Sequence, residues 1–121
     1  MKFNRNFRSP NYSQRQLPIT YLIMHYTEML FEDAVGRLID PEAQVSAHYL
    51  IRNDGEIFNL VDDDKIAWHA GESCWYGQEK LNQNSIGIEL DNLGDSEFSK
   101  EQIKSCLNLC LYLKEKYQLP L

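Results

Sequence analysis

The feature that most constrains the fold is a pair of short apolar segments, residues 19–26 (ITYLIMHY) and 85–90 (SIGIEL). Both are rich in residues that favour strands, and both are far shorter than the roughly 20 apolar residues of a membrane-spanning helix. We therefore expect two buried strands, with residues 19–26 in the middle of a sheet. The second segment contains Glu89, and an ionised carboxylate is costly to bury without a partner. Glu89 therefore either faces water or has a function.

The surrounding patterns predict further elements. The expected segments are a helix over 31–39 and strands over 45–51, over 56–61 and, briefly, within 65–71. Asn53-Asp54-Gly55 is a hairpin turn signal between two of these strands. Residues 71–84 are expected to form a long surface loop, which is a common place for functional residues. Residues 1–18 contain several turn-forming residues and are expected to be irregular.

The last part of the chain predicts a long helix. Ser99 and Gln102 have the spacing of a capping box, and about 17 residues of helical pattern follow. The apolar positions form one stripe, made of Ile103, Cys106, Leu107, Cys110, Leu113 and Tyr117. Cys106 and Cys110 are expected to face the core as reduced thiols. The fold class is therefore α/β, a mixed central β-sheet flanked by helices, in one domain over residues 1–121.

The charge of the chain limits its partners. Acidic residues outnumber basic ones by 18 to 12, which gives a formal net charge of −6. Nucleic acids and anionic membranes are bound by basic patches, so we expect neither as a partner. Residues 1–16 lack the apolar stretch of a secretory signal. We therefore expect a cytoplasmic protein in preference to a periplasmic one.

Three histidines accompany Glu89 as candidates for chemistry. His25 ends an apolar strand, where sheets often present functional groups, and it is either a hydrogen-bonded core residue or a metal ligand. His48 lies within a strand pattern and is expected to be structural. His69 follows Trp68 in AWHAG, where it either packs on the indole or lines a ligand groove. These residues indicate a His/Glu site without naming a reaction.

Four segments taken together resemble the zinc-dependent N-acetylmuramoyl-L-alanine amidases of the type-2 amidase family, which are related to peptidoglycan recognition proteins. The segments are YLIMHYTE (21–28), VSAHYLIRNDGEIFNLVDDDKIAWHAG (45–71), SCWYGQEKLNQNSIGIELDN (73–92) and the late helix. The resemblance implies a mixed sheet flanked by helices, with a groove over one face. It also implies cleavage of the amide between N-acetylmuramic acid and L-alanine, in peptidoglycan or in anhydromuropeptide fragments.

The resemblance implies roles for individual residues as well. By this likeness His25 is a zinc ligand, and Glu89 is the general base that takes a proton from zinc-bound water. His48 matches a position that we interpret as structural or as a support for the site. One stretch matches the groove wall of the family and is expected to contact the substrate: Trp68, His69, Ala70 and Gly71.

The sequence departs from the family pattern at its C-terminal end. A catalytic zinc needs three protein ligands, and the family takes the other two from a segment that would begin near Leu121. We therefore expect a C-terminally truncated domain in which His25 is the only family ligand. Three alternatives stay open: an inactive amidase, an amidase completed by a part outside this sequence, and a non-catalytic muropeptide-binding module. The sheet edge beside residues 20–26 would also be open, which predicts self-association.

Overall fold

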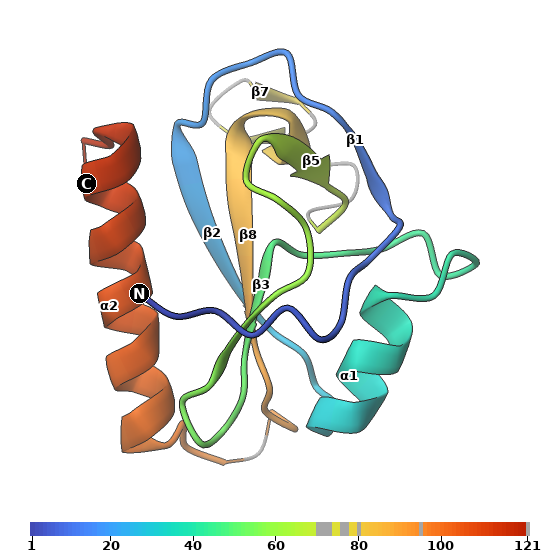
Figure 1. The fold of residues 1–121 in the computed structure, drawn as a ribbon, viewed down its shortest axis with the longest axis vertical. Coiled ribbons are helices and arrows are strands. Elements are labelled where there is room, and N and C mark those ends of the chain that lie inside the picture. The colour runs from blue at the N-terminus through green and yellow to red at the C-terminus, as the bar shows by residue number, and fades with distance from the viewer. Residues whose placement is uncertain (70–73, 76–77, 80, 95, 121) are drawn as a thin grey trace.

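The fold is a sheet with a helix packed on each face (Figure 1). The structure is a computed structural model that describes residues 1–69, 74–75, 78–79, 81–94 and 96–120, with the backbone alone for 74–75, 78–79 and 81. The two helices are α1 (Phe31–Leu38) and α2 (Lys100–Tyr117). Within the described residues, no helix is long and apolar enough to span a membrane.

The main sheet has four strands in the order β2-β8-β3-β4. Their bounds are Tyr21–Tyr26 for β2, Ser85–Leu90 for β8, Tyr49–Ile51 for β3 and Ile57–Asn59 for β4. β2 and β3 run parallel to β8, whereas β3 and β4 form the antiparallel hairpin. The predicted mixed sheet flanked by helices is thus confirmed.

The prediction that residues 19–26 form a middle strand was wrong. β2 stands at one end of the strand order, and β8 lies between β2 and β3. The side chains of β8 are buried except at Glu89, whereas those of β2 are half-buried or exposed. Both strands have apolar sequences, but only β8 has a strand on each side and nearly all of its side chains buried. The self-association expected at this edge stays a prediction.

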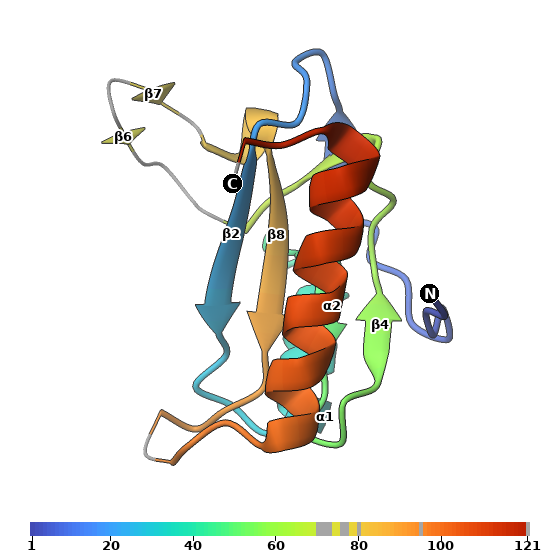
Figure 2. The same cartoon turned by 90° about the vertical axis from the view of Figure 1, so that its left-hand side faces the viewer.

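Side chains alternate along the strands and divide the core into two layers. The layer under α2 holds Tyr49, Ile51, Ile86, Ile88 and Leu90 from the sheet with Cys106, Leu109 and Leu113 from the helix. The layer under α1 holds Leu50, Phe58 and Leu60 with Ala34, Val35 and Leu38. Figure 2 shows α2 lying along β2 and β8, with α1 behind the sheet. Each strand therefore presents one set of side chains to α2 and the other set to the α1 side.

The capping box at the start of α2 is only half formed. The hydroxyl of Ser99 accepts a hydrogen bond from the Gln102 backbone N–H at 3.0 Å, as predicted. The Gln102 side chain, however, turns into the core, where its amide donates to Ile51 O at 2.9 Å and to Asp91 Oδ1 at 2.7 Å. This side chain ties the helix to the sheet instead of capping the helix.

The buried position of Gln102 also changes which face of α2 is covered. The buried residues of this helix are Gln102, Cys106, Leu109 and Leu113. The predicted stripe was therefore wrong at Ile103 and Leu107, which are 45% and 60% exposed, and it missed Leu109. The buried face of α2 was mispredicted because it includes a polar residue, Gln102, which a pattern of apolar residues does not detect. Cys106 and Cys110 are free thiols, buried and half-buried, as expected.

The segment 1–18 is more ordered than predicted. β1 (Tyr12–Gln14) pairs antiparallel with β5 (Lys65–Ala67). Asn4 forms an isolated β-bridge with Phe58 of β4. The turn-forming residues of this segment therefore separate short paired stretches and do not prevent pairing.

Arg15 explains why this N-terminal segment stays on the sheet. Its guanidinium donates to the carbonyl oxygens of Lys65 at 2.7 Å, Ser85 at 3.0 Å and Asp63 at 3.1 Å. One side chain thus joins β1 to β5 and to the start of β8, and burial lowers the pKa of Arg15.

Other predicted segments differ in length. The strand expected over 45–51 is shorter, since only Tyr49–Ile51 pairs in the sheet. The predicted loop 71–84 contains the small pair β6 (Cys74–Trp75) and β7 (Gln78–Glu79) and the 3-10 turn Leu81–Asn84.

Candidate functional site

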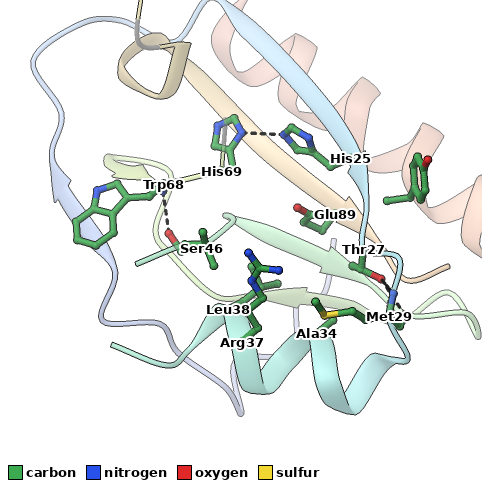
Figure 3. Close-up of a pocket in the computed structure, with 12 residues that line it drawn as sticks. His25, Thr27, Met29, Ala34, Arg37, Leu38, Ser46, Trp68, His69 and Glu89 are labelled. Atoms are coloured by element: carbon green, nitrogen blue, oxygen red, sulfur yellow. Dashed lines mark hydrogen bonds between the residues drawn. The ribbon is translucent and has the colours of Figure 1, made fainter. Parts of the chain in front are cut away.

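A pocket of about 230 Å³ opens on the α1 side of the sheet (Figure 3). Its lining includes His25 from β2, Glu89 from β8, Arg37 from α1, and Trp68 and His69 from the segment after β5. His25 and Glu89 are partners in the parallel register, so they lie side by side on one face of the sheet. The structure therefore brings together four of the residues that the sequence singled out.

The two histidines of the pocket touch each other. Nε2 of His25 lies 3.1 Å from Nδ1 of His69, and Nε2 of His69 lies 2.9 Å from the hydroxyl of Ser85. Burial lowers the pKa of His25, and burial with the positive field of nearby groups lowers the pKa of His69 to about 3. Both rings are therefore neutral at neutral pH, which is the form of imidazole that binds metal ions.

Gly87 makes room for the His69 ring. A Cβ at this glycine would lie 2.3 Å from His69 Cγ, a distance that real Cβ atoms do not reach. The His69 backbone N–H is held by Asn82 Oδ1 at 3.0 Å. Sequence reasoning missed Gly87, although a glycine inside a strand often marks a close approach.

Glu89 is half-buried, and its Oε2 atom has no hydrogen-bond partner within the part of the chain that the structure describes. Burial raises the pKa of Glu89 to about 7, against the opposing effect of Arg37. A carboxylate in this state exchanges protons readily at neutral pH, as a general base must. A half-buried carboxylate with a raised pKa in a pocket is a candidate functional group.

Trp68 is fixed at the rim of the pocket by two hydrogen bonds. Its backbone N–H donates to Ser46 Oγ at 2.9 Å, and its indole N–H donates to Ser13 Oγ at 2.8 Å. Arg37, from the last turn of α1, adds an exposed positive charge to the wall. Arg37 was missed from sequence, because a charged residue near a helix end is most often solvated surface.

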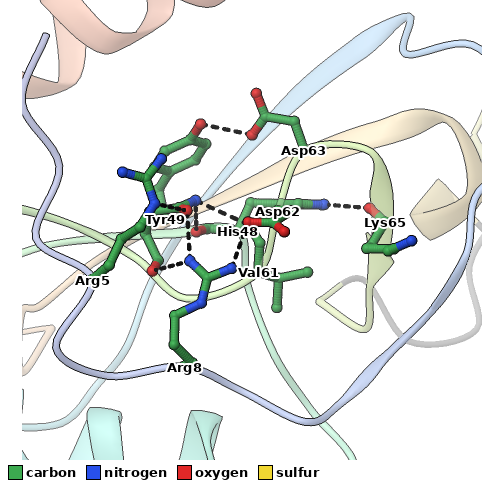
Figure 4. Close-up of polar contacts among 9 residues, drawn as sticks. Arg5, Arg8, His48, Tyr49, Val61, Asp62, Asp63 and Lys65 are labelled. Atoms are coloured by element: carbon green, nitrogen blue, oxygen red, sulfur yellow. Dashed lines mark hydrogen bonds and ion pairs between the residues drawn. The ribbon is translucent and has the colours of Figure 1, made fainter.

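His48 lies behind the pocket and is fully buried. Its Nδ1 accepts the Gly87 backbone N–H at 3.1 Å, so the ring proton is on Nε2, which donates to Lys65 O at 2.8 Å (Figure 4). Burial lowers the pKa of His48 to about 4. The neutral ring thus links β8 to β5 and supports the backbone beside His69. Ala70 and Gly71 lie outside the described residues.

The described side chains do not complete a zinc site. Two nitrogens bound to one tetrahedral zinc at 2.0–2.1 Å lie about 3.3 Å apart, so the ring nitrogens of His25 and His69 have a fitting separation. A catalytic zinc needs three protein ligands. Among the residues searched, which are the described ones, no group of three His, Cys, Asp or Glu side chains could hold a metal ion.

Comparison with known proteins identifies clear relatives. The sequence model of the family described as N-acetylmuramoyl-L-alanine amidase (Amidase_2) matches residues 15–121. The chain is 45% identical over 83 residues to N-acetylmuramoyl-L-alanine amidase AmiD of Escherichia coli, a match that covers 63% of this chain and 29% of AmiD. It is 31% identical over 133 residues to 1,6-anhydro-N-acetylmuramyl-L-alanine amidase AmpD of Haemophilus influenzae, covering 93% of this chain and 72% of AmpD. The chain thus spans less than a third of one relative and nearly three quarters of the other.

Solved structures show the same fold. A selenomethionine derivative of AmpD matches with a TM-score of 0.85 and 30% identity, covering 98% of this chain and 77% of that one. E. coli AmiD in complex with anhydro-N-acetylmuramic acid-L-Ala-D-gamma-Glu-L-Lys matches with a TM-score of 0.78 and 35% identity, covering 88% and 48%. AmpDh3 of Pseudomonas aeruginosa, in complex with an anhydromuramic pentapeptide, matches with a TM-score of 0.75 and 30% identity, covering 98% and 52%.

Proposed function

Because this chain belongs to the N-acetylmuramoyl-L-alanine amidase family, we propose that it hydrolyses the amide between N-acetylmuramic acid and L-alanine. The observation that carries the proposal is the juxtaposition of His25 and Glu89 in one pocket. We propose anhydromuropeptides as the substrate class, because the relative that covers 93% of this chain is named for them. The structures of AmiD and AmpDh3 with anhydromuramic peptides support the same choice. The cytoplasmic location stays a prediction.

Glu89 is the proposed general base. At a pKa of about 7 its carboxylate takes a proton from the attacking water and, as the C–N bond breaks, returns a proton to the leaving amine of L-alanine. Oε2 is buried and has no protein partner among the described residues, so a hydrogen bond from the attacking water would satisfy it.

Zinc is the proposed cofactor, with His25 as a ligand. When bound, zinc supplies a lowered pKa for its water and polarises the substrate carbonyl. Neutral His25 fits this role, and the described residues do not complete a set of three ligands around it. We propose that Trp68, His69, Ala70 and Gly71 contact the substrate, with Trp68 held rigidly at the pocket rim.

The test uses the purified 121-residue chain and an anhydromuramyl peptide. Zinc per chain is measured by elemental analysis, and release of the peptide is followed by chromatography. We expect zinc in the wild type and loss of zinc in His25→Ala. Glu89→Gln should retain zinc, and its rate of turnover should fall about 10²- to 10⁴-fold. Full turnover by Glu89→Gln would refute the assignment of the base.

One observation favours a second candidate function, a muropeptide-binding module without catalysis. The described residues do not complete a zinc site. A binding module would bind the same peptide in calorimetry without releasing product, and Glu89→Gln would bind it as well as the wild type does. Turnover that a chelator abolishes would exclude this alternative.

A further inference from the structure

We propose that the sulfur atoms of Met24, Cys106 and Cys110 form a binding site for a soft monovalent metal ion, Cu(I), between β2 and α2. This site lies on the sheet face opposite the pocket, and the proposal does not depend on the proposed amidase function.

The strand β2 places a sulfur ligand directly behind the pocket. Met24 pairs with Ile88, which belongs to the core layer under α2, whereas the next residue, His25, pairs with Glu89 and lines the pocket. Adjacent side chains of a strand point to opposite faces, so Met24 is directed towards α2. Figure 2 shows α2 alongside β2 on this side of the sheet.

The helix supplies two more sulfur atoms at matching positions. Cys106 and Cys110 are four residues apart on α2, so their side chains lie on the same face, one turn apart. The Cys106 thiol lies 3.7 Å from the Met24 sulfur. Cys110, one turn along the same helix face, interacts with Cys106 and shifts the pKa values of both thiols. Cys106 thus lies in contact with the Met24 sulfur and next to Cys110 on the helix face, and we treat the three side chains as one sulfur cluster.

The separation of the Met24 and Cys106 sulfur atoms suits two ligands of a single ion. A metal–sulfur bond of about 2.3 Å places three sulfur atoms around one ion about 4 Å apart, close to the 3.7 Å that separates Met24 from Cys106. Thiolates with a thioether are the soft ligands that select Cu(I). Zinc sites use thiolate, imidazole and carboxylate donors, usually four of them, so a cluster with a thioether favours Cu(I) over zinc.

The cluster can be reached from solvent, and its two thiols differ in acidity. Met24 is 53% exposed and Cys110 is half-buried, whereas Cys106 is 8% exposed. The neighbouring Cys106 thiol lowers the pKa of the Cys110 thiol, which eases its conversion to thiolate. Contact with Cys110 and burial raise the pKa of Cys106, so the metal ion must displace the Cys106 proton as it binds. Binding replaces two thiol protons by one Cu(I), with no change in the oxidation state of copper, and leaves one negative charge on the centre.

The test is an anaerobic titration of the full chain with Cu(I) against a chromophoric Cu(I) chelator. We expect one Cu(I) per wild-type chain, an affinity at least 100-fold lower in Cys110→Ser and about tenfold lower in Met24→Leu. Two matched controls should bind as the wild type does. Cys74→Ser removes the third thiol, and His25→Ala removes the proposed zinc ligand on the other face.

Equal affinities for the wild type and Cys110→Ser would overturn the proposal, as would loss of binding in Cys74→Ser. X-ray absorption gives a second measure, with three sulfur atoms expected around copper, and a shell of imidazole nitrogens would refute the site. Met24 and Cys110 are the decisive positions because both are partly exposed, and circular dichroism confirms that their variants are folded.

Discussion

The backbone of Gly87 and the imidazole of His69 are packed so closely that a Cβ on the glycine would lie 2.3 Å from the ring. The same ring contacts His25 at 3.1 Å, so the glycine sets the position of a histidine in the pocket. His48 accepts the Gly87 backbone N–H at 3.1 Å from the other side of the site. Gly87 thus contacts His69 and His48 directly, and it positions His25 indirectly through His69.

Gly87→Ala should therefore displace the His69 ring and separate it from His25. Overpacking of this kind typically costs about 1–3 kcal/mol in the free energy of unfolding, which urea denaturation measures. The imidazole ¹⁵N shifts of both histidines should move in NMR spectra. Gly36→Ala is the matched control, because nothing lies within 4 Å of its Cβ position in α1. That variant should gain about 0.5–1 kcal/mol, and unchanged shifts in Gly87→Ala would contradict the close packing.

Arg37→Ala should weaken binding of peptides that carry a free carboxylate. The exposed guanidinium stands at the pocket wall, where it can attract an acidic stem peptide. We expect KM to rise about tenfold with little change in kcat, and Arg37→Lys to retain most of the affinity. An equal loss for a peptide with amidated carboxyl groups would show that the charge is not the cause.

His48 should make the protein less stable in mild acid. Burial holds its pKa at about 4, below the value of about 6.5 expected in the unfolded chain. The unfolded state therefore binds a proton first, and stability that is complete above pH 6.5 is lost as the pH falls towards 4. From pH 7 to pH 5 the wild type should lose about 2 kcal/mol more than His48→Gln, measured by urea denaturation. Parallel pH profiles for the two proteins would argue against a neutral buried ring.

Tyr117→Phe should destabilise the end of α2. The hydroxyls of Tyr117 and Tyr49 each donate to the Asp63 carboxylate at 2.6 Å, which joins the helix, β3 and the turn before β5. Hydrogen bonds to charged groups contribute about 1.5–3 kcal/mol, and the partial exposure of Tyr117 favours the lower end. Tyr26→Phe is a control at an exposed position and should change stability by less than about 0.5 kcal/mol. Equal effects of the two substitutions would show that Asp63 does not hold the helix.

Local patterns predicted much of the secondary structure. The strand 85–90 and the Ser99 cap agree with the structure, and the helix expected over 31–39 spans Phe31–Leu38. These features depend on neighbours in sequence, which periodicity and capping residues report directly. The place of β2 at the sheet edge was not predictable in this way, because it depends on pairings between distant segments.

The candidate site was predicted where the sequence itself was unusual. A carboxylate in an apolar strand drew attention to Glu89, and that residue lies in the pocket. Gly87 and Arg37 were missed because their importance comes only from what packs against them. Gln102 misled the helix pattern for a related reason, since its amide nitrogen donates to the Ile51 carbonyl, a backbone group remote in sequence.

The parallel register of β2 with β8 has a consequence for how the pocket comes into being. His25 and Glu89 lie side by side only after a strand from the first quarter of the chain has paired with one from the last third. Such long-range parallel pairings close late and slowly during folding, since chain entropy is lost before contacts are gained. A nascent chain emerging from the ribosome therefore carries His25 long before it carries Glu89. The pair of His25 and Glu89 has no local precursor, and it comes together only when β2 pairs with β8.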